Sequence, residues 1–133
     1  MKKRKLLIGV LILLFIVAAG VIAVKSFIAK ADADLQKLMA AQVQEVDLAK
    51  ADNGTYSGTY QAFPIDVEVE VVVEDHKIIN IDLKKHTTGK GQAAEVLPKM
   101  VVEAQSLKVD MISGATYSSK TILLAIQDAL SKH

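Results

Sequence analysis

The chain has 133 residues, enough for one small domain, and the absence of cysteine excludes disulfides, thiol chemistry, iron–sulfur clusters and lipid-modified cysteine. Its net charge of +1 hides an uneven distribution, because six of the sixteen basic residues precede Ala31, whereas the other ten and all fifteen acidic residues follow it. The acidic part of the chain argues against nucleic acid as a partner, since binding phosphates requires a basic surface.

A basic cluster followed by an apolar run opens the chain. Residues 2–5 are all Lys or Arg, and the nineteen residues 6–24 are all apolar or glycine. At about 1.5 Å per residue in a helix, the run is long enough to cross the hydrocarbon core of a bilayer. The positive-inside rule then places Lys25 and everything after it outside the cytoplasm. We therefore predict a basic cytoplasmic segment and a single-pass anchor in the cell membrane over residues 1–30, with an extracytoplasmic domain.

A cleavable signal peptide is the alternative interpretation of this segment. Ala29, Lys30 and Ala31 offer an A-x-A-like cleavage site. The apolar run exceeds the usual signal core, however, and the site lies several residues beyond its end, which favours an uncleaved anchor. A pilin-like segment is disfavoured because no acidic residue interrupts the run.

Residues 31–51 are polar and rich in helix formers, which predicts a helical stalk between the bilayer and the domain. The apolar residues of this segment lie near one face of the predicted helix: Leu35, Leu38, Met39, Val43 and Val46. Pairing with a second copy is one interpretation of this seam. Its short length instead favours a spacer helix packed loosely on the domain.

The folded domain is predicted to span residues 52–133. Asp52, Asn53 and Gly54 form a turn signal, after which residues 55–60 alternate small polar and aromatic side chains as a short strand does. At least one of the two aromatic residues of this strand is expected to be simply a half-buried strand residue. The two are Tyr56 and Tyr60.

Two further strands are expected to form an antiparallel hairpin. Residues 65–74 alternate Val or Ile with mostly acidic residues, which is typical of a strand with one buried face. After a turn at residues 74–77, residues 78–84 supply the partner strand, whose predicted inward face is Ile79, Ile81 and Leu83. His76 and His86 lack the spacing of metal ligands, so both are interpreted as solvated histidines.

A loop with two glycines and a helix follow the hairpin. Gly89 and Gly91 stand in the loop HTTGKGQ, residues 86–92, where turning the chain is the simplest role for glycine because a lone G-x-G is weak evidence of phosphate binding. Pro98 lies either in the first turn of a short helix or at a kink in a longer one. The apolar face of this helix is predicted to be Ala94, Leu97, Val101 and Ala104. The predicted fold class is therefore α+β, with a small antiparallel sheet packed with helices.

The stretch DMISGATYSSK, residues 110–120, leads into an amphipathic C-terminal helix that is expected to start near Tyr117. The first turn of such a helix exposes N–H groups and the positive end of the macrodipole, which would stabilise an anion at residues 113–118. Ordinary capping by Ser and Thr is the interpretation that spacing alone favours. Lys120 is expected to lie off the apolar face, which is formed by Ile122, Leu123, Ile126, Ala129 and Leu130.

The order of Asp110, Ser113, Gly114, Ala115 and Thr116 resembles the acceptor motif of the FMN-binding domain family. This family includes the flavin-carrying subunits of sodium-translocating NADH:quinone reductase and small extracytoplasmic flavoproteins. The stretch DNGTYSGTY is similar to the family's opening strand, so the resemblance covers about residues 52–131. The chain departs from the family pattern at one further motif residue and in the glycine loop. Ser118 stands where Thr is frequent, and HTTGKGQ lacks the Pro expected in the respiratory subunits.

The resemblance implies FMN as the cofactor, joined to the Thr116 hydroxyl by a phosphoester bond. It implies that a separate flavin transferase makes this bond with FAD as the donor. Asp110 then matches the upstream acid of the motif, while Gly114 and Ala115 let the modifying enzyme approach. The loop containing Gly89 and Gly91 corresponds to a segment that approaches the flavin. Ser113 and Ser118 complete the predicted cofactor site.

The predicted function is electron transport by a bound flavin, because a flavin accepts one or two electrons. The chain lacks the strand, G-x-G-x-x-G and helix of a dinucleotide-binding fold, so it is not expected to oxidise NADH itself. The expected partners are the membrane, the flavin transferase and a membrane or extracytoplasmic redox protein. Two alternatives remain: a cofactor-free, membrane-tethered interaction domain and a domain that binds free flavin reversibly.

Overall fold

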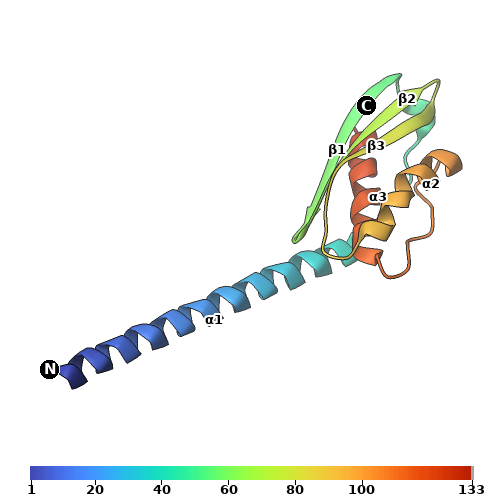
Figure 1. The fold of residues 1–133 in the computed structure, drawn as a ribbon. Helices are drawn as coiled ribbons and strands as arrows, with labels where there is room; N and C mark the ends of the chain where they lie inside the picture. The colour runs from blue at the N-terminus through green and yellow to red at the C-terminus, as the bar shows by residue number, and fades with distance from the viewer. Residues whose placement is uncertain (133) are drawn as a thin grey trace. The chain divides into compact units, whose positions relative to one another are not determined.

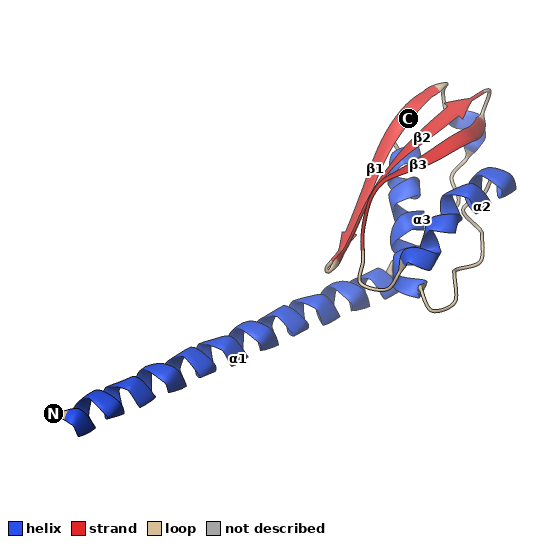
Figure 2. Ribbon diagram, viewed as in Figure 1, coloured by secondary structure: helices blue, strands red, loops and turns tan. Residues whose placement is uncertain are grey.

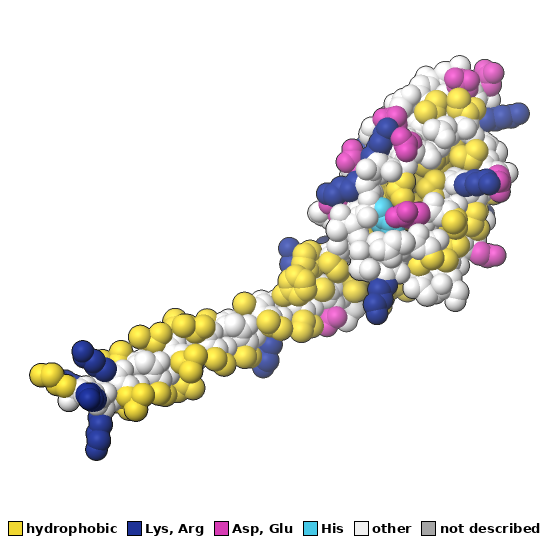
Figure 3. Space-filling model, in the orientation of Figure 1, with side chains coloured by type: hydrophobic (Ala, Val, Ile, Leu, Met, Phe, Trp, Pro, Cys, Tyr) yellow, Lys and Arg dark blue, Asp and Glu magenta, His cyan; other side chains and the backbone are white. Residues whose placement is uncertain are grey.

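The computed structural model describes residues 1–132 and divides into two compact units, Met1–Ala33 and a second unit that begins at Asp34. The helix α1, Lys2–Ala40, contains the apolar run, and every side chain from residue 6 to residue 24 is exposed. Figure 3 shows apolar side chains along this run and Lys or Arg side chains at its start. By length and composition α1 can cross a membrane. The side on which the second unit lies stays a prediction.

The helix predicted for residues 31–51 ends at Ala40, so the prediction is wrong beyond that residue. Residues 42–47 have no regular secondary structure, and a short 3-10 helix, η1, follows at Leu48–Lys50. The apolar residues of the segment pack on the domain core instead of forming one helical seam; they are Leu35, Leu38, Val43, Val46 and Leu48. Tertiary packing here outweighs helix propensity.

Three antiparallel strands form a sheet with the order β1-β2-β3 (Figure 2). They are β1, Gly54–Ala62; β2, Ile65–Glu74; and β3, Lys77–Thr87. The predicted bounds of β2 are confirmed, and its apolar residues alternate inward as expected. Asp75 and His76 join β2 to β3 with φ values of 50° and 60°. Two successive positive φ values are typical of a type I′ turn, whose twist matches that of the paired strands.

A register shift in β3 makes one predicted inward residue wrong. Val72 pairs with Asn80, whereas Val73 pairs with Ile78, so Ile79 is an extra residue on β3. Ile79 is accordingly 47% exposed, while Ile78 is buried in its place. A β-bulge of this kind reverses the inward and outward alternation beyond it.

A second register shift determines the direction of His86. Val69 pairs with Leu83, but Glu68 pairs with Lys85, which leaves Lys84 as the extra residue. His86 therefore lies opposite the buried residue Val67 and on the inward face of the sheet. The loop predicted for residues 86–92 thus begins two residues later than predicted, because β3 continues to Thr87.

Helical segments follow the sheet along the chain (Figure 1). The 3-10 helix η2, Gln92–Val96, runs directly into α2, Leu97–Ala104, and α3 spans Thr116–Leu130. Pro98 lies in the first turn of α2, so the shorter of the two predicted helices is confirmed. α3 packs against β1 and β2, while α2 packs against β3. The predicted α+β class is confirmed.

Lys120, which is predicted to lie off the apolar face of α3, is nevertheless buried. Its Nζ atom donates a hydrogen bond to the backbone oxygen of Met39 at 2.7 Å. That carbonyl belongs to the last turn of α1, where backbone oxygens lack helical partners. Lys120 thus connects the end of α1 to the helix that follows the motif.

Candidate functional site

The N-terminus of α3 has no side-chain cap. Ala115 is the N-cap residue, and it makes no side-chain hydrogen bond to the helix. The capping role that the spacing favoured for Ser and Thr is therefore wrong. Gly114 precedes the cap with φ of +79°, a value that glycine adopts without strain. The first N–H groups of α3 consequently lack a partner from the capping residue, which leaves the positive end of the helix open.

The loop before α3 is fixed by backbone groups and by a buried serine. The N–H of Ile112 donates to Oγ of Ser119 at 3.0 Å, and the N–H of Ala115 donates to the carbonyl of Ile112 at the same distance. Ser119 is fully buried. Two of the motif's hydroxyl residues, Ser118 and Ser119, thus have structural contacts, while Thr116 remains exposed.

Upstream, Glu45 holds the loop that leads to the motif. Its carboxylate accepts hydrogen bonds from Oγ of Ser106 at 2.5 Å and from the N–H of Leu107 at 3.1 Å. Burial raises the pKa of Glu45, but these two hydrogen bonds, helped by the N–H of Val46 and the charge of Lys108, outweigh that effect and hold the pKa below its usual value. Glu45 therefore joins residues 41–47 to the loop that leads to the motif through its charged carboxylate.

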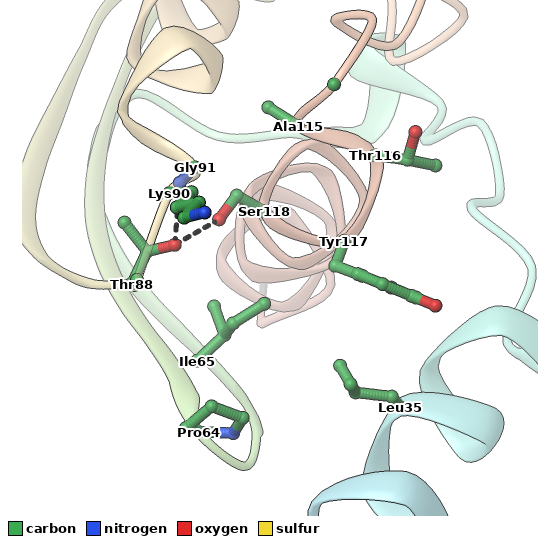
Figure 4. Close-up of a pocket in the computed structure, with 12 residues that line it drawn as sticks. Leu35, Pro64, Ile65, Thr88, Lys90, Gly91, Ala115, Thr116, Tyr117 and Ser118 are labelled. Atoms are coloured by element: carbon green, nitrogen blue, oxygen red, sulfur yellow. Dashed lines mark hydrogen bonds between the residues drawn. The ribbon is translucent and has the colours of Figure 1, made fainter.

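A pocket of about 200 Å³ lies where the start of α3 meets the loop after β3. Six of the eight predicted site residues line it: Gly89, Gly91, Gly114, Ala115, Thr116 and Ser118. The other wall residues are Leu35, Pro64, Ile65, Thr88, Lys90 and Tyr117 (Figure 4). The fold thus brings the glycine loop next to residues 114–118, which follow Gly91 by more than twenty positions in the sequence.

Two predicted site residues lie outside this pocket wall. Ser113 is exposed in the turn that precedes Gly114. Asp110 is also exposed and borders a separate depression that includes Lys108 and Met100. This arrangement leaves both side chains accessible from solvent.

Thr116 and Ser118 lie on different sides of the first turn of α3. Residues that are two positions apart in the sequence lie about 200° apart around an α-helix, so the side chains of Thr116 and Ser118 diverge. Figure 4 shows the Thr116 side chain pointing away from Ser118 and Thr88. Thr116 is exposed, whereas Ser118 is 1% exposed. The two hydroxyls therefore differ in accessibility, and only that of Thr116 is open to a second protein.

Ser118 belongs to a hydrogen-bonded network that sequence reasoning missed. Its Oγ atom lies 3.0 Å from Oγ1 of Thr88 and 3.0 Å from Nε2 of His86. Nδ1 of His86 lies 2.9 Å from Oε1 of Glu95, and the N–H of Gly91 donates to Oγ1 of Thr88 at 3.0 Å. Hydrogen bonds therefore connect β3, the glycine loop, η2 and α3 around one wall of the pocket.

His86 is not a solvated histidine, so that interpretation is wrong. Its side chain is only 2% exposed, whereas the side chain of Glu95 is 48% exposed. The alternation of β3 without a bulge would have placed Lys85 inward instead. No sequence signal marks the bulge at Lys84, which is why His86 escaped detection.

Gly91 approaches protein atoms more closely than any side chain would allow. A Cβ atom there would lie 2.0 Å from Oγ of Ser118 and 2.6 Å from Oγ1 of Thr88. A Cβ atom on Gly89 would meet nothing within 4 Å. The close approach expected between Gly91 and a ligand is thus made, in this structure, to Ser118 and Thr88.

The pocket residues fit part of a flavin. Leu35, Ile65 and Pro64 supply an apolar wall for a ring face, and Tyr117 adds an aromatic side chain. Thr88 and Ser118 supply polar groups, and Lys90 is the one charged residue in this wall. Pockets that enclose a ligand usually measure about 300–1,000 Å³. The smaller volume here can cover only part of a flavin.

This chain matches one protein-family model and individual relatives, among them two reductases. A sequence model of the FMN-binding domain matches residues 62–131, which include every pocket residue except Leu35. NADH:acrylate oxidoreductase of Vibrio harveyi is 32% identical over 92 residues, which cover 67% of this chain. Urocanate reductase of Eggerthella lenta is 37% identical over 78 residues, which cover 56% of it. The chain spans only 9% and 13% of the lengths of these two relatives.

Proposed function

This chain belongs to the FMN-binding domain family and its cofactor is FMN, and from that premise we propose that it is a membrane-anchored electron carrier with FMN attached covalently to Thr116. The observation that carries the proposal is the position of the Thr116 hydroxyl. It is exposed at the first residue of α3, beside a pocket whose residues suit a flavin ring.

The attachment step transfers an FMN group from FAD to the protein. The Thr116 hydroxyl oxygen forms a bond to the phosphorus on the FMN side of the FAD pyrophosphate. The bond from that phosphorus to the bridging oxygen breaks, AMP leaves, and the hydroxyl proton passes to solvent. A separate flavin transferase supplies the base and any metal ion that this step requires. The exposed side chain of Thr116 and the open space beside Gly114 support access by such an enzyme.

The uncapped start of α3 would stabilise the product. The phosphodiester on Thr116 keeps one negative charge close to the N-terminus of the helix, where the N-cap residue supplies no hydrogen bond. An anion at such a position is typically stabilised by about 0.3–1 kcal/mol. Attachment is therefore expected to leave the fold intact.

The carrier role follows from the chemistry that FMN supplies when bound, which is the acceptance and release of one or two electrons. The chain's own residues hold the ring against the apolar wall and leave part of it exposed to a redox partner. Both relatives are oxidoreductases by name, and the matching region is a small part of each. We infer that this chain supplies the same kind of flavin module to a membrane or extracytoplasmic redox partner.

The anchor would keep the carrier at the membrane. The basic residues before the apolar run of α1 favour a cytoplasmic N-terminus, which puts the flavin domain on the extracytoplasmic side. Dissociation of a diffusible cofactor would be irreversible outside the cell. A covalent bond to Thr116 prevents that loss.

Visible absorbance of the purified full-length chain, coexpressed with a flavin transferase, tests the proposal. We expect a flavin spectrum that stays with the polypeptide after denaturation and gel filtration. Flavin that is released by denaturation would instead support reversible binding. A colourless protein, in the presence of a transferase that modifies a control substrate, would contradict the carrier role and favour a cofactor-free interaction domain.

A further inference from the structure

The hydrogen bonds around His86 have one consistent set of donors and acceptors when its ring is neutral. Glu95 accepts a hydrogen bond from Nδ1–H, so Nε2 of the neutral ring is an acceptor. Ser118 then donates its hydrogen to Nε2, Thr88 donates to Ser118, and the N–H of Gly91 donates to Thr88. Every hydroxyl hydrogen in this arrangement points along the network and none points into the pocket.

Protonation of His86 reverses part of the network. Both ring nitrogens then carry hydrogen, so Nε2 donates to Oγ of Ser118. The Ser118 hydrogen must turn away from the ring, either into the pocket or toward Oγ1 of Thr88. If it turns toward Thr88, the Thr88 hydrogen loses its acceptor on Ser118. Both residues line the pocket, so one hydroxyl hydrogen becomes available to a bound ligand.

The groups around His86 favour this response to a negative charge. Glu95 on η2 is the acid hydrogen-bonded to the ring. On β2, the register partner is the uncharged Val67, and the carboxylate of neighbouring Asp66 is bonded to Lys85. Elsewhere on α3, Lys120 donates to Met39. Lys90 in the loop lines the same pocket and adds a positive charge.

We propose that His86 couples reduction of the flavin to uptake of a proton. In response, a hydroxyl hydrogen of Ser118 or Thr88 turns toward the pocket. This inference rests on the proposed function, because it requires the flavin ring to lie beside Ser118. When a reductant supplies two electrons and the ring takes one proton, one negative charge remains on the ring system. His86 then takes a second proton from solvent, which balances that charge, and a reoriented hydroxyl donates a hydrogen bond to the ring.

The burial of His86 strengthens the electrostatic coupling between its ring and a charged flavin. Its side chain is 2% exposed, so the attraction between the imidazolium and a charged ring is less screened by water than at the surface. The half-exposed Glu95 provides contact with solvent at the other ring nitrogen. His76 is a natural control, since it lies in the exposed turn between β2 and β3.

Proton uptake per two electrons tests the proposal in full-length protein that carries FMN by intact mass. Each variant is reduced with dithionite, and protons are counted from the pH dependence of the flavin potential between about pH 5.5 and 8.5. Over part of this range, wild type should take up as much as one more proton per two electrons than His86→Gln. Ser118→Ala should lose part of this difference, and His76→Gln should behave as wild type.

Glu95→Gln provides a second test that does not depend on the folding of a core variant. It removes the carboxylate that accepts the hydrogen bond from Nδ1 of His86, so the extra proton uptake should differ from that of wild type. Equal proton counts in wild type, His86→Gln and Glu95→Gln, all bearing FMN, would overturn the coupling and leave the carrier function intact. Wild-type protein without FMN would overturn the carrier function and this inference with it.

Discussion

Gly91 lies so close to Ser118 that a Cβ atom on the glycine would be 2.0 Å from the serine Oγ. Gly91→Ala should therefore destabilise the domain by about 1–3 kcal/mol, because extra atoms in a packed site force neighbouring groups apart. For a domain of this size, each kcal/mol lowers Tm by about 4–8 °C. Thermal unfolding in detergent, followed by circular dichroism, measures the change.

Gly89→Ala is the matched control for this substitution. Its added methyl group would meet nothing within 4 Å, so Tm should stay close to that of wild type. Equal Tm values for Gly91→Ala and Gly89→Ala would show that the contact between Gly91 and Ser118 does not constrain the loop.

Glu45 makes stability depend on pH. Its pKa is lower in the folded protein than the usual value of 4.5, so the stabilisation is fully present above that value and is lost as the pH falls through the folded pKa. Because Glu45 is exposed and water screens its charge, Glu45→Gln should lower the free energy of unfolding by less than about 1 kcal/mol at pH 7, and by less again near pH 3. Urea unfolding at the two pH values measures this difference.

Glu103→Gln serves as the control for Glu45→Gln, because its carboxylate makes only an exposed pair with Lys99. It should have little effect at either pH. If Glu45→Gln is as stable as wild type at pH 7, the contact between residues 41–47 and the motif loop does not stabilise the domain.

Lys90 should raise the reduction potential of the bound flavin. It is the one charged residue in the pocket wall, and a nearby positive charge favours the electron-rich form of a cofactor. Lys90→Gln should therefore make reduction less favourable, most clearly at low salt. Potentiometric titration measures the shift, with Lys99→Gln on α2 as the control. A potential unchanged by Lys90→Gln would place the ring away from this side chain.

Hydrophobic alternation predicted the sheet well where the strands pair regularly. β2 has its predicted bounds, because Val or Ile stands at every second position from Ile65 to Val73, with mostly acidic residues between them. The same reasoning failed for Ile79 and His86, since two extra residues in β3 reverse the alternation. Such bulges depend on how both strands pair and leave no clear pattern in the sequence of one of them.

The motif and its resemblance to a family predicted most of the pocket wall on α3 and in the glycine loop. Ser118 and Gly91 were expected to serve the cofactor, but their contacts with each other and with Thr88 depend on three-dimensional packing. Leu35 was predicted on the apolar face of the stalk, but its place in this wall depends on how that helix packs on the domain. His86 and Glu95 were missed because the bulge at Lys84 turns His86 to the inward face, where its ring contacts Glu95.

The orientation of the anchor predicts which side of the membrane carries the domain. Protease added to spheroplasts should digest the domain after Lys25, because the basic cluster retains the N-terminus in the cytoplasm. A cytoplasmic control protein should remain intact in the same sample. Protection of the domain until the membrane is broken would contradict this orientation and the extracytoplasmic carrier role.

Intact mass of the chain coexpressed with an active flavin transferase tests the central claim most directly. The account predicts one FMN added with the loss of one water in wild type and in Ser113→Ala, although Ser113→Ala is modified more slowly if the transferase contacts that residue. Thr116→Ala should carry none. Covalent flavin on Thr116→Ala would contradict the assignment of Thr116 and point to Ser113, Ser118 or Ser119, and unmodified wild type would contradict the covalent carrier itself.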